Sequence, residues 1–524
     1  MRMSLPKTLF ASATWLVMSI NGASATEPAG QPVRFEKQPN IVLFFVDDFG
    51  QRDLSCYGSE FYQTPQMDQL ASDGMRFTNA YSAYARCVSS RTGLLSGKYP
   101  CRIEFIAHKT RSREHHLPLS EVTFGEALQE HGYQTCYIGK WHLGKKGGGP
   151  GEQGFDTVVH SGSAGATASF FHPFGVEKGN EVDNPVEGKD GDYLNDLLTD
   201  KAVEYVHDHK DKPFMMVLAH YAVHTPLEAP EDLTTQYKRK LRKQGLAIGG
   251  KRDDEDLEAD RQGFTKTLQN NPVYAAMVQN TDQSLGRVVQ AIEDAGIGDN
   301  TIVILTSDHG GLSTRGLTNR RPLATSNAPF RQGKGSIFEG GTRVPLIVKW
   351  PGRVKVGSVS DVQVTGTDFY PTMLEMANAP KLPEQHVDGV SFVRALDGQS
   401  YQRPPMFWYK WMARPDSTGD TRALSLIDGP YKMIKWIDED LVELFNLEND
   451  PGEQSNLAEK EPNRATEMLA QIATLEDEVG NMREPGKKAL DRRLERLKNK
   501  MKNSKAGAGR KSSGQKQLDP ASSR

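Results

Sequence analysis

The sequence has few cysteines for its length, no large excess of charge of one sign, and a single long apolar run. Its 524 residues include four cysteines, Cys56, Cys87, Cys101 and Cys136, and carry a formal net charge of −3. Four cysteines are too few for disulfides to hold together a chain of this size. With 37% hydrophobic and 25% charged residues, the composition excludes collagen-like, disordered and multi-span membrane proteins. We therefore expect a globular protein with a sizeable core.

The long apolar run lies at the start of the chain. Residues 9–20 follow the basic residues Arg2 and Lys7 and precede three small residues, 23–25. This order is typical of a secretory signal peptide, whereas an uncleaved membrane anchor needs about 20 apolar residues. We therefore predict that residues 1–25 are a signal peptide and that the protein is exported, to the periplasm or to the medium. The mature chain is then expected to have no transmembrane segment.

Basic residues are concentrated near the other end. Residues 486–516 contain twelve Lys and Arg against two acidic residues, so the rest of the chain is acidic. An acidic body argues against nucleic-acid binding, and no nucleic-acid partner is expected. We predict a catalytic domain over residues 26–395, a C-terminal subdomain over 396–480, and a basic, mobile tail over 481–524.

Between these ends, apolar strand-like runs alternate with amphipathic segments. The alternation predicts an α/β fold with a large, mostly parallel sheet flanked by helices on both faces. In open α/β sheets the ligand crevice lies outside the carboxyl ends of the strands, so polar residues that follow different strands are expected to converge there. Four runs have such residues: Asp47 and Asp48 after 41–46, Lys140 and His142 after 134–138, His224 after 214–219, and Asp308 and His309 after 301–305.

Two helices and a second sheet are expected later in the chain. Helical spacing of apolar residues predicts a long scaffold helix over 272–295 and a shorter helix over 369–377. A small antiparallel sheet, closed by a helix near 465–479, is predicted for the C-terminal subdomain. Its strand-like runs lie at residues 406–411, 423–427, 431–437 and 441–445.

Cys87 opens the segment that is most informative about chemistry. Small and hydroxyl-bearing residues follow it as far as Gly97, which suits the start of a helix. Free backbone N–H groups and the helix dipole favour an anion or a thiolate at such a position. The segment by itself leaves two interpretations open, a cysteine nucleophile and a buried, inert cysteine before a helix.

Several ordered motifs carry a family resemblance over about residues 38–460. Cys87-Val-Ser-Ser-Arg91, followed by Leu95-Ser-Gly97, is similar to the signature Cys-x-Pro/Ala-Ser-Arg with a later Leu-Ser/Thr-Gly, although Ser89 replaces the usual Pro or Ala. By these motifs the sequence resembles the type I, arylsulfatase-like sulfatases of the alkaline-phosphatase superfamily. The other matching segments are 40–48, 139–144, 333–336, 339–341, 443–446 and 450–453.

The resemblance implies a modified nucleophile and a metal site. In this family the signature cysteine is oxidised to formylglycine (3-oxoalanine). Cys87 is therefore expected to be modified by a formylglycine-generating maturation enzyme, which is a partner of the chain. Asp47, Asp48, Asp308 and His309 match the ligands of a divalent cation, and Cys87 is expected to bind the same ion. Carboxylates suit Ca²⁺, while the imidazole leaves Mg²⁺ and Mn²⁺ open.

The resemblance also implies a ring of catalytic side chains around Cys87. Arg91 matches the group that holds the hydrated aldehyde, and Lys140 and Lys334 match groups that bind sulfate oxygens. Cations fixed in a water-poor cleft stabilise charge that develops as a sulfate ester breaks. His224 matches the acid that protonates the departing alcohol, and His142 matches the group that handles the formylglycine proton.

The implied reaction is the hydrolysis of sulfate esters by double displacement. One hydroxyl of the hydrated aldehyde at Cys87 attacks sulfur while Asp308 helps to remove its proton. The second hydroxyl, deprotonated with help from His142, then expels sulfate and restores the aldehyde. An unmodified Cys87 lacks this exit and is expected to be nearly inactive.

The substrate is expected to be a sulfated carbohydrate rather than a small sulfate ester. Basic residues in the segments 107–117 and 314–331, among them Arg320, Arg321 and Arg331, would recognise further sulfates or carboxylates, although solvated loops explain them equally well. Two other functions stay open at this point. They are hydrolysis of phosphate or phosphonate monoesters, within the same superfamily, and binding of sulfated glycans without catalysis.

Overall fold

The computed structural model describes residues 37–103, 116–145, 147–175, 182–251, 256–261, 263–439, 441–488 and 490–495. The predicted signal peptide, most of the segment 107–117 and the last part of the predicted tail lie outside the described residues. No helix in the described part of the chain combines the length and the hydrophobicity that a membrane span requires.

The largest sheet has eight strands, and five of them lie side by side and run parallel to one another. These five are β11, β1, β8, β4 and β5, whereas β13 is antiparallel to both of its neighbours. The mostly parallel sheet is therefore confirmed, with an antiparallel strand that the apolar runs did not reveal. The spatial order is β14 (Ser358–Ser360), β2 (Met75–Phe77), β13 (Leu346–Lys349), β11 (Thr301–Ser307), β1 (Asn40–Val46), β8 (Phe214–Ala219), β4 (Gln134–Gly139) and β5 (Thr157–Val159).

The central parallel strands end level with one another. Val46 at the end of β1 pairs with Ser307, Phe45 pairs with Ala219, and Ala219 pairs with Gly139. Every residue of β1 is buried, as expected for a strand covered on both faces. The level ends place the residues that follow β1, β4, β8 and β11 at one edge of the sheet.

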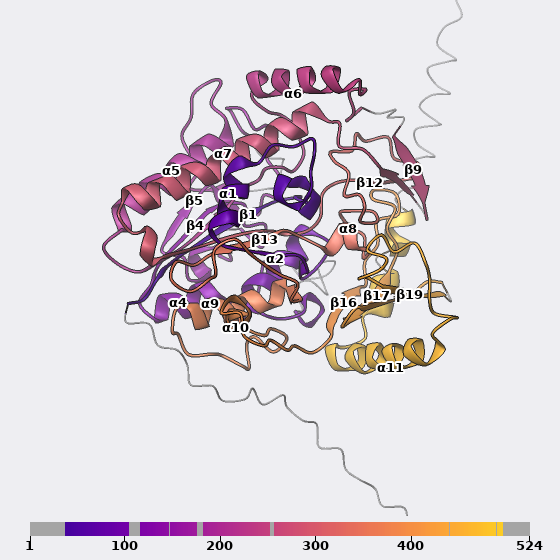
Figure 1. Cartoon of the computed structure of the whole chain (residues 1–524). Helices are drawn as coiled ribbons and strands as arrows, with labels where there is room; N and C mark the ends of the chain where they lie inside the picture. Colours follow the sequence, from indigo (N-terminus) through magenta and orange to yellow (C-terminus); the bar gives the residue numbers. More distant parts are fainter. Residues whose placement is uncertain are drawn as a thin grey trace, which may run out of the picture. The chain divides into compact units, whose positions relative to one another are not determined.

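Two groups of helices cover the two faces of this sheet (Figure 1). In one group α7 packs against α1, α5 and α6, and in the other α9 packs against α2, α4 and α10. The helices expected over 272–295 and 369–377 are confirmed as α7 and α9. The bounds are α1 (Pro65–Asp73), α2 (Cys87–Ser96), α4 (Phe124–Glu130), α5 (Leu194–His209), α6 (Glu231–Gln244), α7 (Pro272–Asp294), α9 (Phe369–Met376) and α10 (Val393–Leu396).

The expected small antiparallel sheet is present. It consists of β16 (Met406–Lys410), β17 (Ala423–Asp428), β18 (Tyr431–Trp436) and β19 (Leu441–Asn446) in that order, and α11 (Pro462–Val479) packs against it. Phe338, which precedes α8 (Glu339–Thr342), shares a hydrophobic cluster with Trp408 and Ile434 of this sheet. The small sheet and the segment after β11 therefore share one core.

Three further pairings involve short strands. β10 (Gly263–Lys266) lies between β9 (Leu257–Asp260) and β12 (Thr314–Gly316), β3 (Ala80–Tyr81) pairs with β15 (Val364–Thr365), and β6 (Ser161–Gly162) pairs with β7 (Val182–Asp183).

The start of the predicted mobile tail differs from the expectation. Residues 483–488 and 490–495 are helical, and Met482 is buried. Arg483 Nε donates to Glu476 Oε1 over 2.6 Å, and Arg493 Nη2 donates to Asp416 Oδ2 over 2.8 Å. These contacts tie Arg483 to α11 and Arg493 to the loop between β16 and β17, while residue 489 and residues 496–524 lie outside the described residues.

Candidate active site

The ends of four parallel strands bring polar side chains together, as the sequence predicted. The segment after β1 is tied to its neighbours through the backbone: Asp47 N donates to Ala222 O over 3.0 Å, and Asp308 N donates to Val46 O over 3.2 Å. Lys140 N donates to Ala219 O over 2.7 Å. These backbone bonds hold the segments after β1, β4, β8 and β11 beside one another.

A compact cluster of potential metal ligands lies at this edge. Within each of two overlapping sets, one ligand atom from every residue lies within 4.8 Å of the others. All of these residues are buried except His224, which is partly exposed. The sets are Asp47, Asp48, Cys87 and His224, and Asp47, Cys87, Asp308 and His309.

Three cations face the three carboxylates of the cluster. Lys140 Nζ forms a close ion pair with Asp47, Lys334 Nζ lies 2.5 Å from Asp48 Oδ1, and Arg91 Nε lies 3.1 Å from Asp308 Oδ2. Arg91 Nη1 also donates to Lys140 O over 2.6 Å. Because buried charges need partners, each pair offsets part of the cost of burying its two groups.

The carboxylates of the cluster differ in acidity. Burial would raise the pKa of Asp47, but Lys140 and the other nearby cations lower it to about 2. Burial and the negative charge of Asp47 raise the pKa of Asp308 to about 8. Two carboxyl groups with opposite shifts are typical of a site that must hold both charge and protons.

Cys87 lies at the N-terminus of α2, inside this cluster. Its Sγ is 3.2 Å from His309 Nε2. Burial alone would raise the pKa of the thiol, but Lys140, Lys334 and His309, with a hydrogen bond from His142, lower it well below its usual value. Position 87 therefore favours a negatively charged oxygen or sulfur.

The other three cysteines differ from Cys87 in this respect. Burial raises the pKa of Cys56 and of Cys101 to about 12, and it raises the pKa of Cys136 well above its usual value. All four cysteines are free thiols. Of the two interpretations of Cys87, the nucleophile is favoured, while the inert, buried cysteine describes Cys136.

Three histidines near the strand ends have different surroundings. His224 forms a 2.7 Å hydrogen bond from Nδ1 to Thr225 O, which leaves Nε2 toward Asp48, 3.8 Å from Oδ2. His142 is fixed by its backbone N–H, which donates to Gly162 O over 2.9 Å. His220 is fully buried and bonds to Ser284 Oγ over 2.9 Å, which fits the structural role expected for it.

Glycines let the loops around the cluster approach closely. A Cβ on Gly310, which follows His309, would lie 1.9 Å from Gly340 O. A Cβ on Gly333, which precedes Lys334, would lie 2.4 Å from Gly311 O. The glycines at 333 and at 340–341 therefore place Lys334 beside the end of β11.

Two basic residues of the segment 314–331 have different positions. Arg331 donates to Asp260 from Nε over 2.9 Å and from Nη2 over 2.7 Å. Its charge is therefore paired with a carboxylate of the protein. Burial lowers the pKa of Arg321 to about 10, against the charge of Asp48, and its Nη2 donates to Thr314 O over 3.1 Å. The segment is thus only partly available to a substrate.

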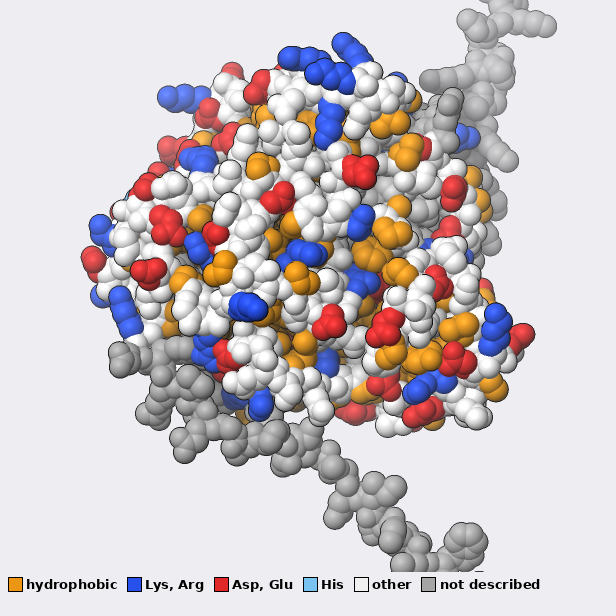
Figure 2. All heavy atoms as spheres, viewed as in Figure 1, with side chains coloured by type: hydrophobic (Ala, Val, Ile, Leu, Met, Phe, Trp, Pro, Cys, Tyr) orange, Lys and Arg blue, Asp and Glu red, His pale blue; other side chains and the backbone are white. Residues whose placement is uncertain are grey.

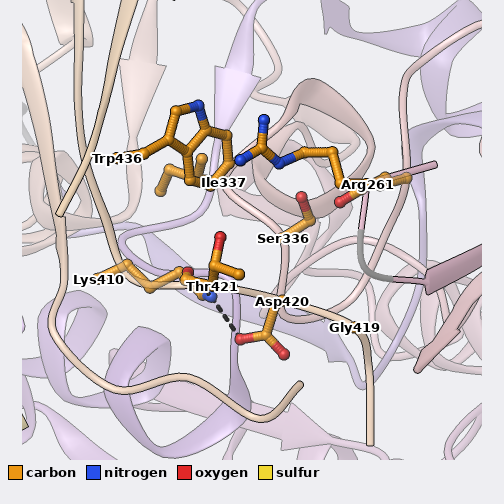
Figure 3. Close-up of a pocket in the computed structure, with 9 residues that line it drawn as sticks. Arg261, Ser336, Ile337, Lys410, Gly419, Asp420, Thr421 and Trp436 are labelled. Atoms are coloured by element: carbon orange, nitrogen blue, oxygen red, sulfur yellow. Dashed lines mark hydrogen bonds and ion pairs between the residues drawn. The ribbon is translucent and has the colours of Figure 1, made fainter. Parts of the chain in front are cut away.

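The small sheet contributes groups near Cys87 that the sequence analysis did not single out. Arg86, directly before Cys87, bonds from Nη2 to Asp420 Oδ1 over 2.7 Å and to Thr418 Oγ1 over 2.6 Å. Asp420 also pairs with Lys410 beside a small cavity (Figure 3). Arg86 could have been noticed as the neighbour of Cys87, whereas nothing in the sequence links Cys87 to residues more than 300 positions away.

Comparisons with known proteins identify the family of this chain. Residues 39–379 match the Sulfatase family, and residues 332–483 match the C-terminal region of N-sulphoglucosamine sulphohydrolase. A protein named Sulfatase from Formosa agariphila is 31% identical over 515 residues, which cover 83% of this chain and 87% of the relative. An N-acetylgalactosamine-6-O-sulfatase from Bacteroides thetaiotaomicron is 27% identical over 84% of this chain and 94% of the relative.

A solved structure has the same fold over most of both chains. The crystal structure of Ps i-CgsB in complex with k-i-k-neocarrahexaose has a TM-score of 0.68 and 27% identity, over 84% of this chain and 93% of that chain. The fold, the family match and the identity to the Formosa agariphila relative lead to one conclusion. The chain belongs to the sulfatase family, whose members hydrolyse sulfate esters.

Proposed function

We propose that this sulfatase acts on sulfated carbohydrates, with formylglycine formed from Cys87 as its nucleophile and a divalent cation beside it. The observation that carries the proposal is the position of Cys87 Sγ among three carboxylates and three cations. The carbohydrate is supported by relatives named for N-acetylgalactosamine sulfate and by the neocarrahexaose complex.

The residues at the cluster fit a divalent cation. Asp47, Asp48 and Asp308 supply carboxylate oxygens and His309 supplies an imidazole nitrogen, a donor set that suits Ca²⁺ and leaves Mg²⁺ and Mn²⁺ as alternatives. Asp47 Oδ1 is buried and accepts no hydrogen bond from the residues that the structure describes. A bound cation would offset the repulsion between the carboxylates and would lower the pKa of a hydroxyl at position 87.

Formylglycine would supply, in its hydrated form, the hydroxyl groups that Cys87 itself lacks. Position 89, where Ser replaces the usual Pro or Ala, lies in the first turn of α2 and is buried. We propose that the maturation enzyme modifies Cys87 in this segment despite the replacement at position 89. The predicted signal peptide, residues 1–25, supports export of the chain to the periplasm or the medium.

The chain's own residues would bind the sulfate group and move protons. Lys140 and Lys334, whose charges act directly on Cys87, would bind the sulfate oxygens, and Arg91 would orient the group at position 87. His224 would donate a proton from Nε2 to the departing alcohol, because its Nδ1 is occupied by Thr225 O. Burial lowers the pKa of His224, which makes its protonated form a better proton donor.

His142 and Asp308 would handle the protons of the nucleophile. His142 hydrogen-bonds to the side chain at position 87, so it can accept a proton there. Asp308 Oδ1 lies 3.6 Å from His309 Nε2, and Asp308 Oδ2 lies 3.1 Å from Arg91 Nε. The raised pKa of Asp308 suits a carboxylate that accepts a proton near neutral pH.

Turnover of paired esters tests the proposal. The protein with formylglycine at position 87 would be assayed on the sulfate ester and the phosphate ester of the same sugar alcohol, with Cys87→Ala as the control. We expect a higher kcat/KM on the sulfate ester and no turnover by the variant. A preference for the phosphate ester would support the phosphate or phosphonate monoester hydrolase instead, and binding without turnover would support the glycan binder.

A further inference from the structure

Arg414, in the loop between β16 and β17, is an exposed cation without a partner of its own. Its side chain forms no hydrogen bond or ion pair with any residue in the described ranges, while its backbone is fixed. Its carbonyl accepts from Ser417 N over 2.9 Å and from Thr418 N over 3.0 Å, and its N–H lies 3.4 Å from Asp420 Oδ2. The loop therefore presents the Arg414 guanidinium to solvent from a rigid base.

Asp420 links the loop of Arg414 to the residue directly before the nucleophile position. Its Oδ1 accepts from Arg86 Nη2 over 2.7 Å, and its Oδ2 lies 3.4 Å from Arg414 N. Because Arg86 directly precedes Cys87, the loop of Arg414 lies beside the position where the reacting sulfate would bind.

Arg321 lies in the loop after β12, which contacts the loop of Arg414. Asn319 Nδ2 donates to Asp416 O over 3.1 Å and to Ser417 O over 3.2 Å, so the loop after β12 is tied to the loop of Arg414. Arg321 is held by a 3.1 Å bond from Nη2 to Thr314 O, yet its Nε is buried without a hydrogen-bond partner among the described residues. A buried donor without a partner calls for an acceptor that arrives with a ligand.

The two loops hold more positive than negative charge. Arg86, Arg321, Arg414 and Lys410 are grouped around one carboxylate, Asp420, which already pairs with Arg86 and Lys410. Arg493, the other cation that acts on Arg414, is paired with Asp416. The remaining positive charge belongs to Arg321 and Arg414. On the face drawn in Figure 2, Lys and Arg side chains also gather around a hollow near its middle.

We propose that Arg414 and Arg321 form an anion subsite that binds a second sulfate or a carboxylate of the substrate, beside the sulfate that is hydrolysed. Guanidinium groups bind both anions through paired N–H donors. The inference rests on the proposed function, because it takes Cys87 as the position of the reacting sulfate. It makes the small sheet a determinant of specificity, through a loop that carries none of the expected catalytic residues.

The test compares sugars that differ only in their second anion. Formylglycine-bearing protein would be assayed on N-acetylgalactosamine 6-sulfate, on the same sugar with a second sulfate, and on the same sugar linked to a uronic acid. The variants are Arg414→Gln and Arg321→Gln. The matched control is Arg239→Gln, an exposed arginine on α6.

We expect each subsite variant to lose about tenfold or more in kcat/KM on a doubly anionic sugar, mainly through KM, and less than about twofold on the singly sulfated sugar. The control should change neither value. A larger loss with the second sulfate or with the uronic acid identifies which anion binds. Equal losses on all three sugars, or no loss, would overturn the inference.

Binding separates this inference from the proposed function. Calorimetric titration of the doubly sulfated sugar into Cys87→Ala protein, with and without Arg414→Gln, needs no turnover. We expect Arg414→Gln to weaken binding by about tenfold. If wild-type protein hydrolyses none of the sugars, the proposed function fails, and the titration still decides the inference. Unchanged binding would contradict the subsite.

Discussion

At the scale of single residues, burial decides which titratable groups stay neutral and which stay charged. Asp47 and Lys140 are fully buried yet charged, because each is the partner of the other. His220 and His160 are also buried, but no carboxylate in the described part of the chain offsets their burial, which lowers their pKa values to about 3 and about 4. These two histidines are neutral in the folded protein.

His220 should make the protein less stable in acid. Between about pH 6.5 and pH 3 the unfolded chain binds a proton at His220 that the folded chain does not, so the free energy of unfolding falls as the pH falls. The cost of this single group at pH 4 is about 3 kcal/mol. Denaturant unfolding at pH 7 and pH 4 should show a smaller decrease for His220→Gln than for wild type. An equal decrease in both proteins would contradict a neutral His220.

The carboxylate cluster predicts stabilisation by a divalent cation. A cation held by Asp47, Asp48 and Asp308 binds the folded chain and not the unfolded chain, so chelation should lower the melting temperature and Ca²⁺ should restore it. At about 100 times its Kd the ion contributes about 2.7 kcal/mol. Scanning calorimetry of wild type and of Asp48→Asn, with EDTA and with excess Ca²⁺, measures this effect. We expect a much smaller shift for the variant, and an absent shift in wild type would contradict the metal site.

At the scale of elements, close contact between loops positions the cluster. The loop after β11 passes so near the start of α8 that Gly310 has no room for a Cβ beside Gly340 O. His309 directly precedes Gly310, and Lys334 N donates to Gly311 O over 3.0 Å. The geometry of the site therefore depends on glycines that carry no chemistry.

Substitution of Gly310 by Ala should disrupt the site and the fold. The added Cβ would lie 1.9 Å from a backbone oxygen, so one loop must move, at a cost of about 3 kcal/mol or more. Urea unfolding should show this loss together with reduced sulfate release. Gly151→Ala is the matched control, because the nearest atom to its Cβ is 4.0 Å away, and similar behaviour of the two variants would refute the contact.

The strands and their convergence could be predicted from the sequence, but the loops between distant segments could not. The run 41–46 and the run 301–305 appear as β1 and β11 with only one or two residues added, because buried parallel strands are apolar throughout. β13 was not foreseen, since a short apolar run does not reveal its direction. Arg414 was not foreseen either, because its nearness to Cys87 arises from the packing of segments that are far apart in the sequence.

At the scale of the whole molecule, buried ion pairs join the small sheet to the catalytic part. Lys432 on β18 lies 2.9 Å from Glu339 Oε1 on α8 and 2.8 Å from Glu453 Oε1. All three side chains are almost completely buried. The same junction supports Arg86 through Asp420, so the small sheet is part of the support of the active site.

Replacing Lys432 by Met should destabilise the whole protein. The substitution would remove the cation between Glu339 and Glu453 and leave Glu339 paired with Arg343, which costs about 3–5 kcal/mol because Glu453 loses its ion-pair partner. Urea unfolding measures the loss, and Lys460→Met, at an exposed lysine, should change the midpoint little. If Lys432→Met unfolds at the wild-type urea midpoint, the ion pairs of Lys432 with Glu339 and Glu453 do not hold the small sheet to the rest of the fold.

Formylglycine at position 87 is the central claim of this account, and the mass of the peptide that spans Cys87 tests it most directly. The peptide would be taken from protein made in its own host, so that the maturation enzyme for this chain is present. We predict the mass of an aldehyde in place of the thiol, in spite of Ser89. A thiol at position 87 in all of the protein would contradict the account.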